Sequence, residues 1–176
     1  MDELILVEPE SCWREEIEAV RQEILDSADA DKFAGCSGLN HAESAEAWIT
    51  DIRAYESETT CPPEKVPSTV RLAVRKSDKK VVGIIDLRHS INHPVLGLWG
   101  GHIGYSVRPG ERRKGYAKEM LRLMLEEAGK RGFEKVMITC STDNTASERT
   151  ILANGGVYEK TVSVEDEQIK RYWITL

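Results

Sequence analysis

The densest group of chemically useful residues in the sequence is a short basic segment that ends in a glycine. Arg112, Arg113 and Lys114 are followed directly by Gly115. The first N–H groups of a helix lack partners within the helix and carry partial positive charge, so a helix that begins here would attract an anion. A glycine at that point lets a phosphate come close to the backbone. The segment therefore predicts an anion-binding loop, although a solvated basic turn between a strand and a helix would use the same residue types.

Such a loop needs a strand before it and a helix after it, and the sequence supplies both. Ile103, Tyr105 and Val107 alternate with small or polar residues, which is the period of a strand with one covered face. Pro109 and Gly110 then end the strand. The helical stripe beyond the loop consists of Ala117, Met120, Leu121, Met124 and Ala128. Two better-known phosphate-binding patterns, Gly-x-x-x-x-Gly-Lys-Ser/Thr and Gly-x-Gly-x-x-Gly, do not occur in this segment.

The other elements are predicted from periodicity and from breaks at glycine and proline. Strands are expected over residues 4–7, 69–75, 80–88, 135–140, 157–164 and 168–176. Helices are expected over residues 14–25, 42–55, 116–131 and 145–153. The stretches 27–41 and 89–101 are expected to be loops.

The segment from Arg112 to Ala117 resembles the Arg/Gln-x-x-Gly-x-Gly/Ala signature of the GNAT superfamily of N-acetyltransferases. Val107-Arg108-Pro109 is similar to the Val-x-Pro that ends the preceding strand in that family. Asn144-x-x-Ser147 is similar to the family's Asn-x-x-Ala, whose asparagine contacts the pantetheine arm of the cofactor. Asn144 could equally be an ordinary helix cap.

This resemblance implies an α+β fold, a mixed and largely antiparallel sheet flanked by helices, in a single domain over residues 1–176. It implies acetyl-CoA as cosubstrate, with its pyrophosphate on the basic loop and its thioester along the strand backbone at 105–107. The cofactor-binding residues implied in this way are Tyr105, Ser106, Val107, Arg112, Arg113, Lys114, Gly115, Tyr116, Ala117, Asn144 and Ser147.

The catalytic groups are less well defined than the cofactor site. An attacking alkyl amine has a pKa near 10 and must be neutral, so a base is expected. His102 is the candidate, because histidine titrates near neutral pH and related enzymes often place a glutamate on this strand. A half-buried structural histidine is the competing interpretation. Family members often carry a tyrosine as general acid seven residues after the asparagine, where this chain has Ile151. Tyr158, Tyr116 or water could replace it.

The function that we predict is acetyl-CoA-dependent transfer of acetyl to a primary amine of a small molecule or peptide, by direct attack in a ternary complex. The absence of the tyrosine favours a non-catalytic acyl-CoA-binding regulatory domain as the alternative. A protein-interaction module with a degenerate cofactor site is a third possibility, against which the intact basic loop argues.

Size and composition agree with an ordinary globular protein. The chain has 176 residues and a net charge of −6, which argues against a nucleic-acid partner. No apolar run approaches the ~20 residues of a membrane span, and the N-terminus lacks the pattern of a signal peptide. The four cysteines include no C-x-x-C pair, so neither a metal site nor disulfides are expected, and reduced thiols in a cytoplasm are the default. The final hairpin could serve a homodimer.

Overall fold

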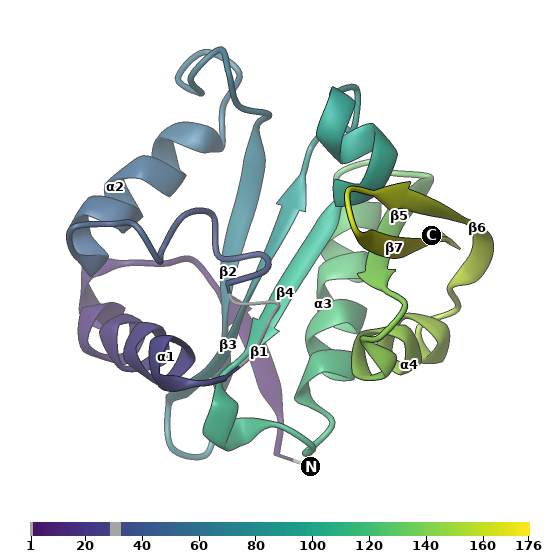
Figure 1. Ribbon diagram of the computed structural model, residues 1–176. Helices are drawn as coiled ribbons and strands as arrows, with labels where there is room; N and C mark the ends of the chain where they lie inside the picture. Colours follow the sequence, from purple (N-terminus) through teal and green to yellow (C-terminus); the bar gives the residue numbers. More distant parts are fainter. Residues whose placement is uncertain (1, 29–32) are drawn as a thin grey trace.

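The computed structural model describes residues 2–28 and 33–176, and their strands form two antiparallel sheets (Figure 1). The first sheet has the strand order β1-β2-β3-β4 and the second has the order β5-β7-β6. The strands of the first sheet are β1 (Leu4–Val7), β2 (Ser68–Arg75), β3 (Lys80–Arg88) and β4 (Ile103–Val107). Those of the second are β5 (Lys135–Ser141), β6 (Val157–Val164) and β7 (Glu167–Thr175). The predicted α+β fold, with a largely antiparallel sheet flanked by helices, is confirmed, but the expected single mixed sheet is divided in two between β4 and β5.

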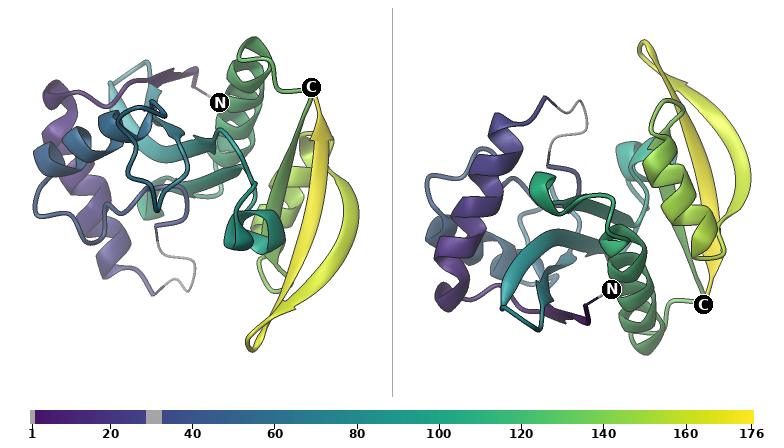
Figure 2. Two further views of the ribbon diagram at one scale, coloured as in Figure 1. Left: turned by 90° about the horizontal axis from the view of Figure 1, so that it is seen from above. Right: turned by 90° about the horizontal axis from the view of Figure 1, so that it is seen from below.

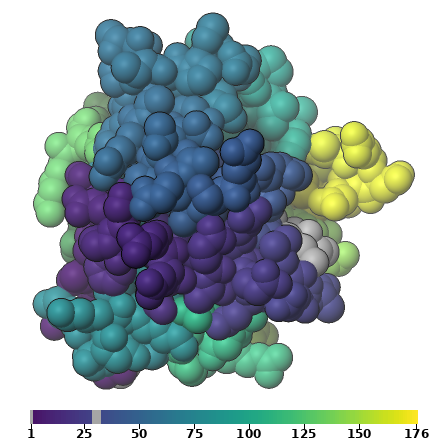
Figure 3. All heavy atoms as spheres, turned by 90° about the vertical axis from the view of Figure 1, so that its left-hand side faces the viewer, coloured from purple at the N-terminus to yellow at the C-terminus, as the bar shows by residue number. Residues whose placement is uncertain are grey.

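The helices cover the sheets in layers. They are α1 (Arg14–Asp26), α2 (Ala45–Tyr55), α3 (Tyr116–Lys130) and α4 (Thr145–Ala153). Helices α1 and α2 lie on one face of the first sheet, α3 lies between the two sheets, and α4 lies beside the second sheet (Figure 2). The space-filling view shows α1 and α2 covering their side of the molecule, with the tip of the β6–β7 hairpin projecting beside them (Figure 3).

Each face of the first sheet has its own hydrophobic core. On the α1–α2 side, Ile17, Val20 and Ile24 recur at helical spacing and are buried against the sheet. Trp48 is also buried there, and its indole N–H donates to the carbonyl of Cys36 at 2.8 Å. These contacts fix the segment that follows residue 32 to α2.

The second core surrounds α3, whose apolar stripe is buried as the sequence predicts. Met120, Leu121 and Met124 have no exposed surface and pack with buried residues of both sheets. Deleting a buried side chain of this size costs roughly 2–5 kcal/mol in the free energy of unfolding. Helix α3 therefore holds the two sheets together, and its start is fixed relative to both.

Most of the expected elements agree with the structure to within a residue, but one helix start and one expected loop differ further. Helix α2 begins at Ala45 rather than near residue 42, because the hydroxyl of Ser44 accepts the N–H of Ala47 at 3.2 Å and caps the helix there. The expected loop 89–101 contains a π-helical turn, η2 (Leu96–Gly100). Residues 29–32 of the other expected loop lie outside the described residues.

The backbone of residues 33–39 lies directly against β4. A Cβ on Gly35 would stand 2.1 Å from the carbonyl oxygen of Gly104, and Gly35 has a φ of +71°. A Cβ on Gly104 would stand 2.8 Å from the backbone nitrogen of Gly35. Both glycines are therefore needed for two backbone segments to touch.

We expect Gly35→Ala to lower the free energy of unfolding by more than the roughly 1–2 kcal/mol of a left-handed residue, because the clash adds to the strain. Gly38→Ala is the matched control, since Gly38 has a φ of +85° but nothing within 4 Å of its Cβ position. Urea unfolding of both variants gives the comparison. Equal losses for the two variants would contradict the close approach.

Candidate cofactor site

The site predicted from the sequence lies where β4 and β5 part. The strands run in the same direction, with α3 as the crossover between them (Figure 1). At their beginning the N–H of His102 donates to the carbonyl of Met137 at 2.7 Å, and the N–H of Met137 donates to Nδ1 of His102 at 2.8 Å. Beyond this contact the strands belong to different sheets. Their facing edges therefore carry polar backbone groups without a ladder between them.

The register of β4 shows which groups face this opening. The N–H of Arg88 donates to the carbonyl of His102, and the N–H of Arg108 donates to that of Val82, so the even-numbered residues of β4 bond to β3. The N–H and C=O groups of Ile103, Tyr105 and Val107 therefore point toward β5. This is the part of the strand on which the sequence analysis placed the thioester.

The edge of β5 is arranged in the same way. Met137 bonds to His102, and the N–H of Thr142 donates to Gln168 in continuation of the pairing with β7. Thr139 and Ser141 therefore direct their backbone groups toward β4.

The turn η2 joins the two sheets at the beginning of these strands. Arg88 of the first sheet donates to the carbonyls of Gly100 and Gly101. Arg171 of the second sheet donates to those of Gly97 and Leu98. Sequence periodicity did not predict this turn, because the turn is stabilised by two arginines that are distant in the sequence, and periodicity reports only local patterns.

The predicted anion-binding loop follows β4 and begins α3. Gly115 is the N-cap of α3, with a φ of +85°, and has no side chain with which to cap the helix. By contrast, Ser44 and Asn144 cap α2 and α4 through their side-chain oxygens. Arg113 also has a positive φ, of 61°. Residues 112–115 are exposed, so the approach to the start of α3 is open, and the first N–H groups of a helix suit an anion.

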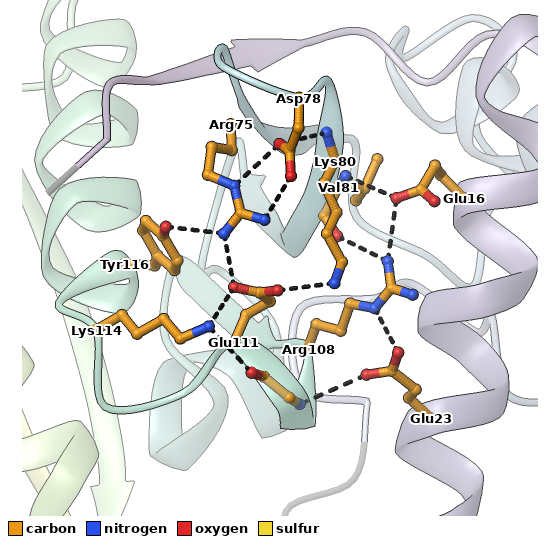
Figure 4. Close-up of polar contacts among 11 residues, drawn as sticks. Glu16, Glu23, Arg75, Asp78, Lys80, Val81, Arg108, Glu111, Lys114 and Tyr116 are labelled. Atoms are coloured by element: carbon orange, nitrogen blue, oxygen red, sulfur yellow. Dashed lines mark hydrogen bonds and ion pairs between the residues drawn. The ribbon is translucent and has the colours of Figure 1, made fainter.

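The basic side chains of the loop do not all have the same role. Nε of Arg112 donates to the carbonyl of Val107 at 3.0 Å and turns back toward the edge of β4. Nζ of Lys114 bonds to the buried carboxylate of Glu111 at 2.8 Å (Figure 4). Tyr116 is buried, and its hydroxyl accepts from Arg75 at 3.0 Å. Lys114 and Tyr116 thus contribute to the shape of the loop.

The remaining predicted cofactor residues lie on both sides of the opening. Oδ1 of Asn144 accepts the N–H of Ser147 at 3.0 Å, so the helix-cap role is present. The hydroxyl of Ser147 bonds to that of Tyr105 at 2.8 Å and so joins α4 to β4. Ser106 points to the other face and donates to the carbonyl of Ala34 at 2.7 Å. Ala117 is half-buried in the first turn of α3.

Ile151, which stands where the family often has a tyrosine, is fully buried in the core around α3. Tyr105 instead brings a phenol to α4 from the neighbouring strand. Burial raises the pKa of Tyr105 to about 12, although the hydrogen bond to Ser147 acts in the opposite direction. The phenol therefore stays protonated at neutral pH. Tyr158 bonds to Thr161 on its own strand.

His102 lies at the apex of the opening. It is 7% exposed, and the rings of Phe133 and Trp173 contact it edge-on. Its Nδ1 accepts a backbone N–H, which leaves the proton of the neutral ring on Nε2. Burial, together with the charge of Arg88, lowers the pKa of His102 to about 4. These contacts favour the structural interpretation of His102 over that of a base.

One buried carboxylate near the site had no sequence signal. Asp86 of β3 is buried, and its Oδ1 accepts the N–H of Gly104 at 2.9 Å. Its Oδ2 lies 3.4 Å from the hydroxyl of Ser37 and 3.3 Å from Nε of Arg88. Burial raises the pKa of Asp86, and these partners act in the opposite direction. Asp86 thus pins the segment at residues 35–37 to β4, a role visible only once the two are adjacent.

Within residues 2–28 and 33–176, no group of three or more His, Cys, Asp or Glu side chains is placed to hold a metal ion. In the same residues, no helix has the length and apolar character needed to span a membrane.

The lowered pKa of His102 gives a pH test of its structural role. An unfolded histidine takes up a proton near pH 6.5 and the folded one only near pH 4, so the unfolded state binds more protons in this window and stability falls as pH falls. We expect His102→Gln, which keeps an acceptor, to remove a loss of about 2 kcal/mol between pH 7 and pH 4.5. Urea unfolding at the two pH values measures it. A stability difference from the wild type that is equal at both pH values would contradict the assignment.

Comparison with known proteins supports the resemblance to the GNAT superfamily. The sequence model of the family described as "Acetyltransferase (GNAT) domain" matches residues 8–157. Among curated proteins, none matches the chain in sequence.

Several solved structures share the fold. The microcin self-immunity acetyltransferase MccE, in complex with acetyl-CoA and AMP, is 16% identical with a TM-score of 0.65, covering 100% of this chain and 94% of that one. A GNAT-family acetyltransferase from Bacillus anthracis is 16% identical with a TM-score of 0.66, covering 99% and 96%. RimL, a ribosomal alpha-N-protein acetyltransferase in complex with coenzyme A, is 15% identical with a TM-score of 0.67, covering 98% and 94%.

At these identities the structural neighbours establish the fold, while the family match extends from before α1 to the start of β6 and includes the basic loop and the Asn144–Ser147 segment. The chain therefore belongs to the GNAT acetyltransferase family.

Proposed function

We propose that this chain, acting as a single domain, is an acetyl-CoA-dependent N-acetyltransferase that acetylates a primary amine of a small molecule or peptide by direct attack in a ternary complex. The observation that carries the proposal is the convergence of two features. The open edge of β4 ends at Val107, and the glycine-capped start of α3 follows within the same basic loop.

The two features match the two chemical parts of the cofactor. The outward N–H and C=O groups of Tyr105 and the outward N–H of Val107 can pair with the amides of a pantetheine arm as a strand would. The N–H groups at the start of α3 can hold the pyrophosphate. Arg112 and Arg113 add positive charge on the exposed side of the loop.

When bound, acetyl-CoA supplies the acetyl group as an activated thioester. The N–H groups on the edge of β4 are positioned to donate to a carbonyl oxygen on which negative charge develops. Because these groups belong to a strand fixed by β3 and by the segment at residues 35–37, they need little rearrangement during the reaction.

The hydroxyl pair of Tyr105 and Ser147 is our candidate for the group that protonates the departing sulfur. It lies between β4 and the first turn of α4, next to Asn144. The proton lost by the amine must end on sulfur, and two bonded hydroxyls can accept one proton while they donate another. A thiol has a pKa near 8.5, so its departure needs less assistance than that of an alkoxide. The pair therefore replaces the tyrosine missing at residue 151.

A non-catalytic acyl-CoA-binding domain is the second candidate, and the buried Ile151 is the observation that favours it. A screen of amine classes for coenzyme A release separates the two. Release with any amine class supports the enzyme. Acetyl-CoA binding without release across polyamines, amino acids, aminoglycosides and peptides with a primary amino terminus supports the binding domain.

We expect Gly115→Glu to weaken acetyl-CoA binding by about 10²-fold or more, because a carboxylate at the start of α3 repels the pyrophosphate and obstructs its approach. Isothermal titration calorimetry measures the affinity. Gly132→Glu is the matched control. Gly132 lies beyond the opposite end of α3, with a φ of +87° and nothing within 4 Å of its Cβ position.

The two variants carry the same added charge and the same backbone strain. If both bind acetyl-CoA as tightly as the wild type, the start of α3 is not the phosphate site. If both lose affinity equally, the effect comes from strain or overall charge and not from the site.

With an amine substrate in hand, we expect Ser147→Ala to lower turnover by about 10²-fold, the lower end of the range for general acid catalysis. Tyr105→Phe should lower it in the same direction with a smaller effect, because Ser147 keeps its hydroxyl. Affinity for acetyl-CoA should change little in either variant. Ser163→Ala, on the β6–β7 hairpin, is the control for loss of a hydroxyl. Wild-type turnover in Ser147→Ala would remove the hydroxyl pair from the mechanism.

A further inference from the structure

Glu111 is a buried carboxylate in the turn between β4 and α3, one residue before the basic loop. It is 4% exposed, although it belongs to a short exposed connection. A charged side chain is buried at such a place only when it is fully paired, since an unpaired buried charge is costly. Its partners therefore indicate what it does.

The carboxylate of Glu111 binds three cations (Figure 4). Its Oε1 accepts from Nζ of Lys80 at 2.7 Å. Its Oε2 accepts from Nη1 of Arg75 at 2.7 Å and from Nζ of Lys114 at 2.8 Å. Burial raises the pKa of Glu111, but the hydrogen bonds from Lys114, Lys80 and Arg75 outweigh it and lower the pKa to about 2. Glu111 is therefore ionised at any pH at which the protein would work.

These partners come from three parts of the fold. Arg75 ends β2, Lys80 begins β3, and Lys114 belongs to the loop itself. Arg75 also donates to the hydroxyl of Tyr116, the first residue of α3. Gly115, the N-cap of α3, lies between Lys114 and Tyr116. Lys114 bonds to Glu111 directly, and Tyr116 is linked to it through Arg75, so the N-cap is held on both sides.

A second ion-pair group fixes the other end of the same connection (Figure 4). Arg108 is buried and pairs with Glu23 at 2.7 Å and Glu16 at 3.0 Å, both on α1. Glu16 also accepts the N–H of Val81 at 2.9 Å. The connection from residue 108 to residue 116 is thus tied to α1, β2 and β3 on its inner side, while residues 112–115 remain exposed on the outer side.

We propose that Glu111 is a positioning residue for cofactor binding, which sets the shape of the phosphate loop before the ligand arrives, and that Lys114 serves this carboxylate rather than the phosphate. The inference rests on the proposed function, because it assigns these residues to the same acetyl-CoA site. A loop that is already ordered loses less conformational entropy on binding, and this raises affinity.

If Glu111 acted only through its charge, removing that charge would strengthen the binding of the cofactor, whereas loss of a positioning residue weakens it. Removing a negative charge beside a phosphate site makes the potential there more positive and should strengthen the binding of an anion. The sign of the change therefore separates the two roles, and a merely structural role predicts lower stability with unchanged affinity.

The experiment measures acetyl-CoA affinity by calorimetry for wild type, Glu111→Gln and a matched control, at a temperature well below unfolding. We expect Glu111→Gln to weaken binding by about 10-fold, as for the loss of a charge-assisted hydrogen bond. The control is Glu119→Gln, which makes the same charge change in the first turn of α3, where Glu119 pairs with Arg122 at 2.7 Å. Its affinity should equal or exceed that of the wild type.

A second variant tests the role of Lys114 and does not require the carboxylate to be changed. Lys114 is half exposed, so Lys114→Met should fold. If Lys114 acts through Glu111, the substitution weakens binding in the wild-type background and has less than about two-fold effect in the Glu111→Gln background. Additive losses would show that Lys114 contacts the cofactor, and would overturn that part of the proposal.

The same measurements distinguish a failure of the positioning role from a failure of the proposed function. Absence of acetyl-CoA binding by the wild type would remove the cofactor site itself. Binding by the wild type together with unchanged or tighter binding by Glu111→Gln would overturn the positioning role alone.

Discussion

The structure depends on the point at which β4 and β5 stop pairing. Two parallel strands that begin side by side would ordinarily continue their ladder, because unpaired backbone groups on a strand edge are costly unless water or a ligand satisfies them. Here the imidazole of His102 takes the N–H of Met137 in place of a backbone carbonyl, and the strands then enter separate sheets. Helix α3 packs against both sheets and keeps them apart. The polar edge of β4 that results is the feature from which a cofactor site can be built.

The basic loop poses a second physical problem, which is repulsion among its own cations in the absence of a ligand. Arg112, Arg113 and Lys114 are adjacent in the sequence, and Arg75 and Lys80 come close to them in the fold. The buried carboxylate of Glu111 offsets part of this charge on the inner side, and the carbonyl of Val107 engages Arg112. Residues Arg112 and Arg113 lie on the exposed side of the loop, directly before the start of α3. Under the proposal for Glu111, ion pairing on the inner side of the loop prepares its outer side for an anion.

Sequence periodicity predicted the parts of the protein that local physics determines. The stripe of α3, the alternation of β4 and the glycine before Tyr116 each follow from contacts within a few residues, so their positions were correct to within a residue or two. The division of the sheet could not be predicted, because it depends on His102 meeting Met137, 35 residues away. Asp86, Glu111 and η2 were missed for the same reason, since each is stabilised by partners that only the folded chain brings near. The residues that motif spacing singled out lie on β4, the basic loop and the start of α4, whereas Asp86 and Glu111 were missed because their partners are distant in the sequence.

Ile151 stands where family members often have a tyrosine, and the packing around it accounts for an apolar residue at this position. An aromatic side chain at residue 151 would overfill a position with no exposed surface, next to Gly156, whose Cβ would already stand 2.4 Å from Cγ2 of Ile151. Tyr105 approaches the same helix from β4, and its hydroxyl bonds to Ser147 one turn before Ile151. An apolar residue at position 151 of α4 and a tyrosine at position 105 of β4 are compatible with each other in this packing. Under the proposed function, the hydroxyl groups that assist the departing sulfur come from β4 and the first turn of α4, and the packing of α4 against β4 brings the two together.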